Sequence, residues 1–246
     1  MAAERAPFIK DVRDRVSERQ SGAVLAAFDG RGTVRLLDDA GGVLLLERLE
    51  PGTSLVPRVL EGDDDGASRI LADVIQRMSP RHSPACPTVH DWALGFDRYL
   101  ASADASVPRP LVIAAHQAYL RLCASQTSPR LLHGDLHHGN VLFDARRGWL
   151  AIDPKGVVGE VEYEIGAALR NPYEGLDFVV KPATITRRAS LFAHLLGLDV
   201  DRILAWGFAQ AVLAAVWEVE DGIPVDEDDL YLRLARQLAA IQGVSF

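Results

Sequence analysis

Apolar residues recur along this chain at two spacings, one typical of helices and one typical of strands. Helical spacing is found in five segments, at 13–28, 70–78, 111–122, 204–215 and 230–241. The apolar residues expected on one face of the first helix are Val16, Ala23, Val24 and Ala27. We expect Asp226 to be the N-cap of the last helix, because its side chain can accept hydrogen bonds from the unpaired amides of a first turn.

Shorter apolar runs predict strands near the N-terminus, at Ala6–Val12, Thr33–Leu37 and Val43–Arg48. Pro51 and Gly52 then interrupt the pattern, and both are residues that commonly end regular structure. We therefore expect a small, β-containing lobe over residues 1–50 and a larger, mainly helical lobe over residues 51–246. Such a chain belongs to the α+β class.

Two further apolar runs, Val141–Phe143 and Trp149–Ile152, are each the length of a strand. The segment Asp144-Ala-Arg-Arg-Gly148 between them has turn chemistry, so the whole predicts a β-hairpin. A hairpin brings its two ends together. We therefore expect Asn140, which precedes the first strand, to lie beside Asp153, which follows the second.

An amide oxygen and a carboxylate that converge in this way suit Mg²⁺, which takes few protein ligands and keeps water and phosphate oxygens around it. Asp135 lies earlier in the same loop. One carboxylate to orient a hydroxyl, with an Asn and an Asp for Mg²⁺, is the residue set used for phosphoryl transfer by protein kinases. The alternative for Asp135 is a turn residue that bonds its own backbone, beside Gly134.

Composition and charge restrict the kind of partner. The chain has 246 residues, of which 48% are hydrophobic and 24% charged, as is usual for a globular protein with a substantial core. The net charge of −8 argues against nucleic acid and would attract a cationic substrate, although it could also serve only solubility. We expect a small cationic molecule as substrate and no obligate protein partner.

The sequence also bears on location. No apolar run approaches the roughly 18–20 residues of a membrane span, and the first residues lack the apolar core of a secretory signal. Cys86 and Cys123 are too few for a disulfide framework. We therefore expect a cytoplasmic protein that does not act at a membrane.

Two other chemistries fit the sequence poorly. The chain has no Gly-x-x-x-x-Gly-Lys-Ser/Thr sequence, which excludes a P-loop kinase as the simple interpretation. His133, His137 and His138 could suggest zinc. They have no fourth ligand at a suitable spacing and lie beside oxygen ligands, which argues against that metal.

The motifs around the hairpin resemble those of a known family. His133-Gly-Asp-x-x-x-x-Asn140 resembles the catalytic loop of protein kinases, with Gly134 where those enzymes usually have Arg. Ile152-Asp-Pro154 resembles the metal-binding element of small-molecule kinases. The longer string LLHGDLHHGNVLFDARRGWLAIDPKGVVGEVEYEIGAALRNP resembles aminoglycoside phosphotransferases, specifically the streptomycin 6-kinase and hydroxyurea-resistance kinase branch.

The resemblance extends over most of the chain, from about Asp29 onward, and the segment Trp206–Gly222 is similar to that branch's C-terminal helix. It implies a protein-kinase-like, two-lobe fold with an incomplete N-terminal β lobe. It also implies ATP and Mg²⁺ as cofactors and transfer of the γ-phosphate to a hydroxyl group.

Residue roles carry over from the matching positions. The resemblance implies that Asp135 is the catalytic base that orients the hydroxyl, and that Asn140 and Asp153 hold Mg²⁺. It implies structural hydrogen bonds for His133 within the loop. Glu164 stands where the family usually has Asp, and we expect it to brace the catalytic loop from a helix start.

For the nucleotide, the resemblance points to Lys10, which is one of only three lysines and lies in a strand-like segment. A kinase lysine on the phosphates is usually held by a helix Glu. Glu18 is the nearest candidate, although the family's Glu would align closer to Ser21. The alternative for Lys10 is a solvated surface lysine. We expect backbone groups near Glu47 and Leu49 to bind adenine.

For the acceptor, the residues of interest are Trp217, Glu218, Glu220 and Asp221, near the end of a predicted helix. Carboxylates at a helix C-terminus are unfavourable for the helix but suit guanidino or ammonium groups. The alternative is an exposed helix end before a turn.

No Gly-rich hairpin precedes Lys10, which leaves two explanations, missing upstream residues or a true short form with weakened catalysis. The sequence as a whole predicts an ATP-dependent kinase for an aminoglycoside of the streptomycin type. The alternatives are a kinase for another small hydroxylated metabolite and a catalytically impaired nucleotide-binding remnant.

Overall fold

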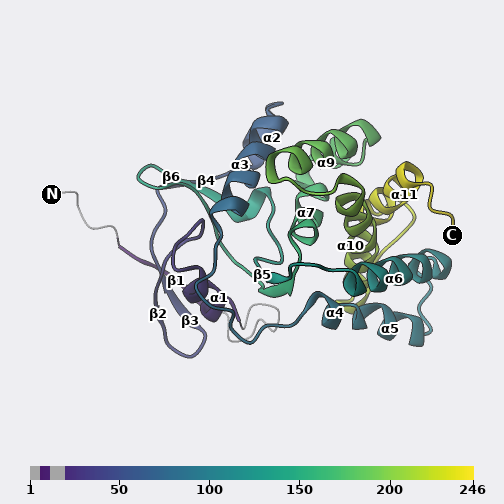
Figure 1. Cartoon of the computed structure of the whole chain (residues 1–246), viewed down its shortest axis with the longest axis horizontal. Helices are drawn as coiled ribbons and strands as arrows, with labels where there is room; N and C mark the ends of the chain where they lie inside the picture. The colour runs from purple at the N-terminus through teal and green to yellow at the C-terminus, as the bar shows by residue number, and fades with distance from the viewer. Residues whose placement is uncertain (1–5, 12–19) are drawn as a thin grey trace. The chain divides into compact units, whose positions relative to one another are not determined.

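A computed structural model describes residues 6–11 and 20–246 of the chain. The chain divides into two compact units. The first comprises Met1–Cys86 and Leu131–Val157, and the second comprises Pro87–Arg130 and Val158–Phe246 (Figure 1). The chain passes between these units after Cys86, Arg130 and Val157. This division does not test the expected lobe boundary near Pro51, which stays a prediction.

The described residues of the first unit form two three-stranded sheets and three helices. Its strands are β1 (Phe8–Asp11), β2 (Leu36–Asp39), β3 (Val43–Leu46), β4 (Pro51–Ser54), β6 (Val141–Asp144) and β7 (Gly148–Ala151). Its helices are α1 (Ser21–Phe28), α2 (Val56–Leu60) and α3 (Asp64–Arg77), with a 3₁₀ turn, η2, at His138–Asn140. Strands β5 (Arg130–Leu132) and β8 (Val157–Gly159) span the boundaries between the units.

The N-terminal sheet has the order β1-β3-β2, with antiparallel neighbours. The expected strand at Ala6–Val12 is confirmed as β1 over its described part. The expectation of a strand from Thr33 was wrong, since β2 begins at Leu36. The reason is that the chain before β2 bonds the hairpin instead: the Val34 amide donates to the Ala151 carbonyl over 2.9 Å.

Helix α1 packs on this sheet through a small apolar core. The buried cluster consists of Leu25, Val34, Leu44 and Leu46. The face expected for this helix was partly wrong, because Ala23 is exposed while Leu25 and Phe28 are buried. Val16 lies outside the described residues. Each large apolar side chain that is fully buried stabilises the fold by roughly 1.5–3 kcal/mol.

The predicted hairpin is confirmed as β6 and β7, which pair from Val141↔Ala151 to Asp144↔Gly148. The expectation that Pro51 ends regular structure was wrong, because Pro51 is the first residue of β4, which pairs with β6. Proline is tolerated at the first residue of an edge strand, where its missing N–H costs no ladder bond.

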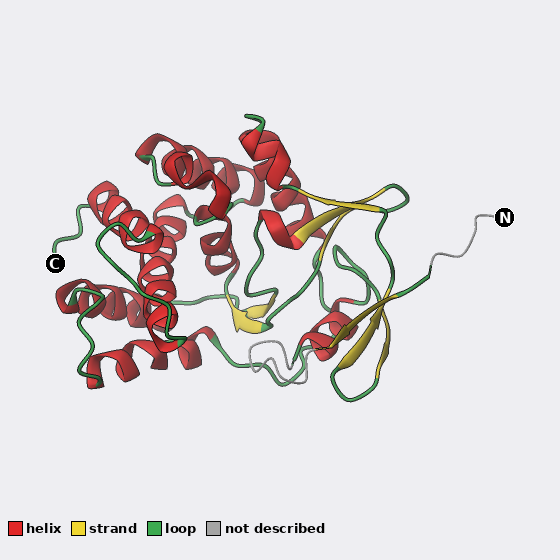
Figure 2. Cartoon of the chain, turned by 180° about the vertical axis from the view of Figure 1, so that it is seen from behind, coloured by secondary structure: helices red, strands yellow, loops and turns green. Residues whose placement is uncertain are grey.

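The second unit is mainly helical (red in Figure 2). Its elements are α4 (Val89–Trp92), α5 (Leu94–Ala101), α6 (Arg109–Ala124), α7 (Val161–Leu169), η3 (Tyr173–Gly175), α8 (Leu176–Val179), α9 (Pro182–Leu196), α10 (Val200–Glu220) and α11 (Leu230–Gln242). Helix α10 is its centre and packs against α5, α6, α7, α9 and α11. Trp206 of α10 meets Tyr119 and Tyr163 edge-on, with ring centroids 4.9 and 5.0 Å away.

Two further expectations about the helical unit need correction. The N-cap of α11 is Asp229, whose carboxylate accepts hydrogen bonds from the amides of Tyr231 and Leu232, and not Asp226. Helix α10 has the length and apolar composition of a membrane span, although no apolar run of that length was expected from the sequence. In this chain 72% of its apolar window is buried inside the protein, as expected of a core helix.

Candidate active site

The candidate site is built on the loop between β5 and β6, and its anchor is His133. The imidazole is fully buried, and its Nε2 lies 2.7 Å from the Ile152 carbonyl. The amide of Asp135 donates to Nδ1 over 3.2 Å. These partners assign the neutral tautomer with the proton on Nε2. Burial lowers the pKa of His133 from 6.5 to about 4, so the ring stays neutral at physiological pH.

Asn140 is fixed against the same loop. Its Nδ2 donates to the backbone carbonyl of Asp135 over 2.9 Å. Because the amide nitrogen is committed in this way, the amide oxygen is the atom that can serve as a ligand. Its own carbonyl accepts from the Ile152 amide over 2.9 Å, which sets Asn140 beside the residue preceding Asp153. The hairpin therefore brings the two residues together as the sequence predicted.

Asp153 has an unusual backbone. Among the described residues, Asp29 and Asp153 are the only non-glycine residues with positive φ, at 49° and 58°. A left-handed conformation is uncommon outside glycine, although Asp tolerates it better than most residues, and such outliers concentrate at functional sites. The next residue is held in place, since Ser21 Oγ donates to the Pro154 carbonyl over 2.6 Å.

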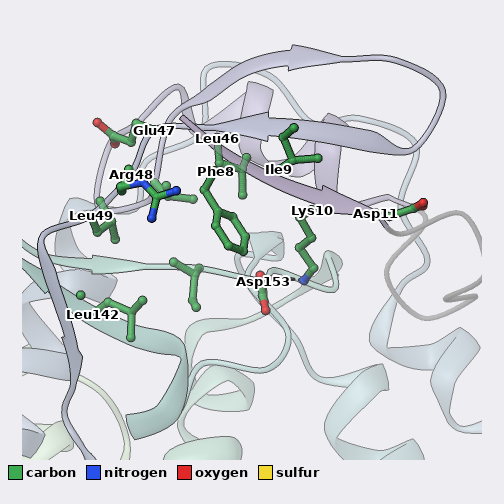
Figure 3. A pocket seen from close by; sticks show the side chains of 13 residues that line it. Phe8, Ile9, Lys10, Asp11, Leu46, Glu47, Arg48, Leu49, Leu142 and Asp153 are labelled. Carbon is green, nitrogen blue, oxygen red and sulfur yellow. Dashed lines mark ion pairs between the residues drawn. The ribbon is translucent and has the colours of Figure 1, made fainter. Parts of the chain in front are cut away.

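Lys10 reaches this residue from β1. Its Nζ lies 2.7 Å from Asp153 Oδ1, and the Lys10 side chain is only 12% exposed (Figure 3). Lys10 is therefore no solvated surface lysine. The expected partner Glu18 lies outside the described residues. Ser21, where the family's Glu was expected to align, is tied to Pro154 instead.

A pocket of about 530 Å³ lies next to this ion pair. Lys10 and Asp153 line one end, and Glu47, Arg48 and Leu49 line the other (Figure 3). Its apolar lining is Phe8, Ile9, Val34, Leu46, Leu49, Leu142 and Ile152. Such a pocket, with mostly apolar walls between charged groups, can hold a flat ring and a charged tail.

The backbone near Glu47 is partly committed. Its amide donates to the Arg35 carbonyl over 3.0 Å, and its carboxylate accepts from the Arg35 amide and from Arg147. Within the described part of the chain, the Glu47 carbonyl and the Leu49 amide make no hydrogen bond. These are one acceptor and one donor at the edge of the pocket, which is what an adenine edge needs.

One site residue was missed from the sequence. Lys155 Nζ lies 3.1 Å from Asp135 Oδ2, so Asp135 is no isolated turn residue. The sequence did contain a signal for this residue. Lys155 is one of the chain's three lysines and lies two positions beyond Asp153.

The other predicted residues belong to the second unit. Glu164 is buried in the first turn of α7, and its bracing role stays a prediction. Glu220 makes two hydrogen bonds with Arg98, of 2.8 and 2.9 Å. Burial, followed by the charge of Asp229, raises the pKa of Glu218 to about 7. The acidic residues therefore have different partners within this unit.

Among the described residues, no group of three or more His, Cys, Asp or Glu side chains could hold a metal ion. His137 instead caps the η2 turn, since its Nδ1 accepts from the Gly139 amide over 3.1 Å. An Asn and an Asp completed by water and phosphate, as Mg²⁺ requires, would not form such a group.

Solved structures share this architecture. The choline kinase LicA from Streptococcus pneumoniae matches with a TM-score of 0.61 and 14% identity, over 95% of this chain and 86% of that one. A thermostable aminoglycoside phosphotransferase APH(4)-Ia, in complex with AMP-PNP and hygromycin B, matches with a TM-score of 0.62 and 16% identity, over 93% and 83%. The chain therefore has the α+β, two-lobe fold of protein-kinase-like enzymes.

Sequence comparison narrows this class. The family model described as aminoglycoside/hydroxyurea antibiotic resistance kinase matches residues 5–222, and the chain belongs to that family. It is 34% identical to streptomycin 3''-kinase of Klebsiella pneumoniae, over 85% of this chain and 79% of that protein. It is 36% identical to hydroxyurea phosphotransferase of Kitasatospora aureofaciens, over 80% of this chain but only 58% of that protein. The chain is a phosphotransferase that uses a nucleotide and acts on the hydroxyl group of a small molecule.

Proposed function

We propose that this protein transfers the γ-phosphate of ATP to a hydroxyl group of a streptomycin-type aminoglycoside. One observation supports this most strongly. Lys10 of β1 pairs with Asp153 at the end of one pocket, and the loop that carries Asp135 and Asn140 is bonded to Ile152, the residue before Asp153.

The pocket supports the nucleotide half of the proposal. Its apolar walls would enclose adenine, with the Glu47 carbonyl and the Leu49 amide available to the ring edge. Phe8 is 49% exposed, and its ring points into the pocket, where a bound base would cover it (Figure 3). Lys10 would bind the phosphates at the far end.

The oxygen ligands of this site fit Mg²⁺. The amide oxygen of Asn140 is oriented by the bond from Nδ2, and Asp153 is held between the hairpin and the Pro154 contact. When bound there, the ion would neutralise phosphate charge. Lys10 pairs with the same Asp153 carboxylate. When nucleotide is absent, its positive charge would partly replace that of the ion.

The transfer itself would use Asp135. The acceptor hydroxyl oxygen bonds to the γ-phosphorus while the bond from that phosphorus to the β–γ bridging oxygen breaks, which releases ADP. The hydroxyl proton passes to the Asp135 carboxylate. Since the transition state is loose, the main contribution of Asp135 is to orient the hydroxyl. Glu164 would support the loop.

The acceptor is the least constrained part. The net charge of −8 attracts a cationic molecule, and Glu218 and Asp221 at the end of α10 offer carboxylates to guanidino groups, with Trp217 as an apolar neighbour. Glu220 would have to exchange Arg98 for the substrate. Both described cysteines are free thiols, which supports our proposal of a cytoplasmic protein.

A second acceptor class has support of its own. The sequence identity to hydroxyurea phosphotransferase, 36%, is as high as the 34% identity to streptomycin 3''-kinase. Hydroxyurea is small and neutral, so its use would not depend on the acidic residues of α10. Substitution of Glu218 by Gln would therefore separate the two acceptors.

The proposal is tested by incubating the protein with ATP and Mg²⁺ and either streptomycin, hygromycin B or hydroxyurea. We expect streptomycin to gain the mass of one phosphoryl group, and chelation of Mg²⁺ to prevent this. Transfer to hydroxyurea alone would replace the acceptor assignment. If none of these acceptors is phosphorylated while thermal shift shows binding of Mg·ATP, the proposed acceptors are wrong, and a kinase for another small hydroxylated metabolite or a nucleotide-binding remnant takes their place.

A further inference from the structure

Lys155 has no role in the site as predicted from the sequence, yet it contacts the central carboxylate. Its Nζ lies 3.1 Å from Asp135 Oδ2, and the side chains are 34% and 17% exposed. We propose that Lys155 is a positioning residue. It holds one oxygen of Asp135 so that the other oxygen receives the acceptor hydroxyl. This inference rests on the proposed function and deepens it.

The backbone under Lys155 is fixed from two directions. The amides of Lys155 and Gly156 both donate to the His133 carbonyl over 2.9 Å. On the other side, Ser21 Oγ holds the Pro154 carbonyl at 2.6 Å. The side chain of Lys155 therefore starts from a well-defined point within reach of Asp135.

His133 connects both partners of this ion pair. Its carbonyl binds the amide of Lys155, while its ring accepts from the amide of Asp135 over 3.2 Å. Because one buried residue holds both backbones, the two side chains are placed relative to each other before any substrate arrives. That arrangement is the preorganisation that an orienting carboxylate requires.

Gly156 allows this segment to lie close to α1. Its φ is +77°, and a Cβ at this position would lie 2.4 Å from Val24 Cγ2. Any larger residue would push the backbone away from α1 and displace the neighbouring Lys155. The glycine therefore supports the position of the lysine.

The choice of lysine is informative in this chain. Lysine and arginine together number 26, and only three of them are lysines. Two of the three, Lys10 and Lys155, contact the candidate acids Asp153 and Asp135. An ammonium group is a compact charge that binds one oxygen, whereas a guanidinium would engage both carboxylate oxygens and exclude a hydroxyl.

The experiment compares kcat and KM of Lys155→Met and Lys155→Arg with those of Lys181→Ala. Lys181 is the remaining lysine and is exposed at the start of α9. We expect Lys155→Met to lower kcat by on the order of 100-fold, with nucleotide affinity and melting temperature close to wild type. Lys155→Arg keeps the charge but should lose about tenfold, because its fork occupies both oxygens.

A double substitution tests whether Lys155 acts through Asp135. In an Asp135→Asn background, we expect Lys155→Met to change the residual rate by no more than about twofold. An equal loss in both backgrounds would overturn the inference. So would a kcat of Lys155→Met equal to that of Lys181→Ala, or a loss of rate that merely follows a loss of melting temperature. If the wild type transfers no phosphate to any acceptor, the proposed function fails first and the inference falls with it.

Discussion

The ammonium group of Lys10 and the carboxylate of Asp153 form an ion pair, with Nζ 2.7 Å from Oδ1. The pair joins β1 to the residue that ends the hairpin, across a large separation in sequence. Both groups were expected to bind parts of Mg·ATP. Without nucleotide, the two opposite charges neutralise each other in a partly buried site. Nucleotide binding would turn the Lys10 ammonium toward the phosphates and the Asp153 carboxylate toward Mg²⁺.

Substitution of Lys10 tests its assignment to the phosphates. Lys10→Ala removes charge-assisted hydrogen bonds worth about 1.5–3 kcal/mol. We therefore expect the Kd for Mg·AMP-PNP to rise by roughly 10–100-fold, as measured by calorimetry. The exposed Lys181→Ala serves as the control. Equal affinities for the two variants would show that Lys10 does not contact the nucleotide.

Acid stability should report on His133. Burial lowers its pKa from 6.5 to about 4, so the unfolded chain takes up a proton that the folded chain refuses. The contribution of His133 to the free energy of unfolding is therefore complete above about pH 6.5 and is lost as the pH falls toward 4. A difference of this size is worth roughly 3 kcal/mol. Urea unfolding at several pH values measures it.

The matched variants for this measurement are His133→Gln and His82→Gln. His133→Gln should lower stability at neutral pH and flatten the curve between pH 6.5 and 4. His82 is exposed, so its substitution should leave the curve unchanged. If His133→Gln keeps the full acid sensitivity, the buried neutral imidazole is not its cause.

Arg147 at the tip of the hairpin is expected to stabilise the first unit. Its guanidinium binds the Glu47 carboxylate and the carbonyls of Gly30 and Thr33. Arg147→Ala removes a donor that these partly buried groups share, although Glu47 keeps its bond from the Arg35 amide, and should cost about 1–3 kcal/mol. Thermal unfolding measures the loss, at roughly 2–4 °C per kcal/mol. Arg69→Ala, exposed on α3, should change little.

Glu218 should make stability depend on pH in the opposite direction. Burial and the carboxylates of Asp229 and Asp221 raise its pKa from 4.5 to about 7. Between these values the folded chain holds a proton that the unfolded chain has released, so stability falls as the pH rises from about 4.5 to 7. Solvent screening reduces the effect to about 1 kcal/mol. Glu218→Gln should remove it, whereas Glu227→Gln should not.

Much of the candidate site could be predicted because it is local in sequence. The strands β6 and β7 are short apolar runs around a turn, and their pairing brings the ends of the hairpin, and so Asn140 and Asp153, together. The turn is stabilised by Asp144, whose Oδ1 accepts from the amides of Arg146 and Arg147 over 2.8 and 2.9 Å. Such local bonding is what turn composition reports.

Features that depend on distant partners could not be predicted. Pro51 has the character of a strand breaker, and only its pairing with Asp144 reveals a strand. Lys155 gains meaning through His133, which holds its backbone near Asp135. Ser21 looks like an ordinary helix residue until its bond to Pro154 is seen. In each case the deciding interaction joins segments that sequence patterns treat separately.

The rate of phosphate transfer to streptomycin by wild type and Asp135→Asn, measured with nucleotide affinity in the same samples, tests the central claim most directly. We expect the substitution to lower kcat on the order of 10³-fold and to change the Kd for Mg·AMP-PNP by less than about threefold. A variant that transfers phosphate as fast as wild type would contradict the assignment of Asp135 and the site built around it.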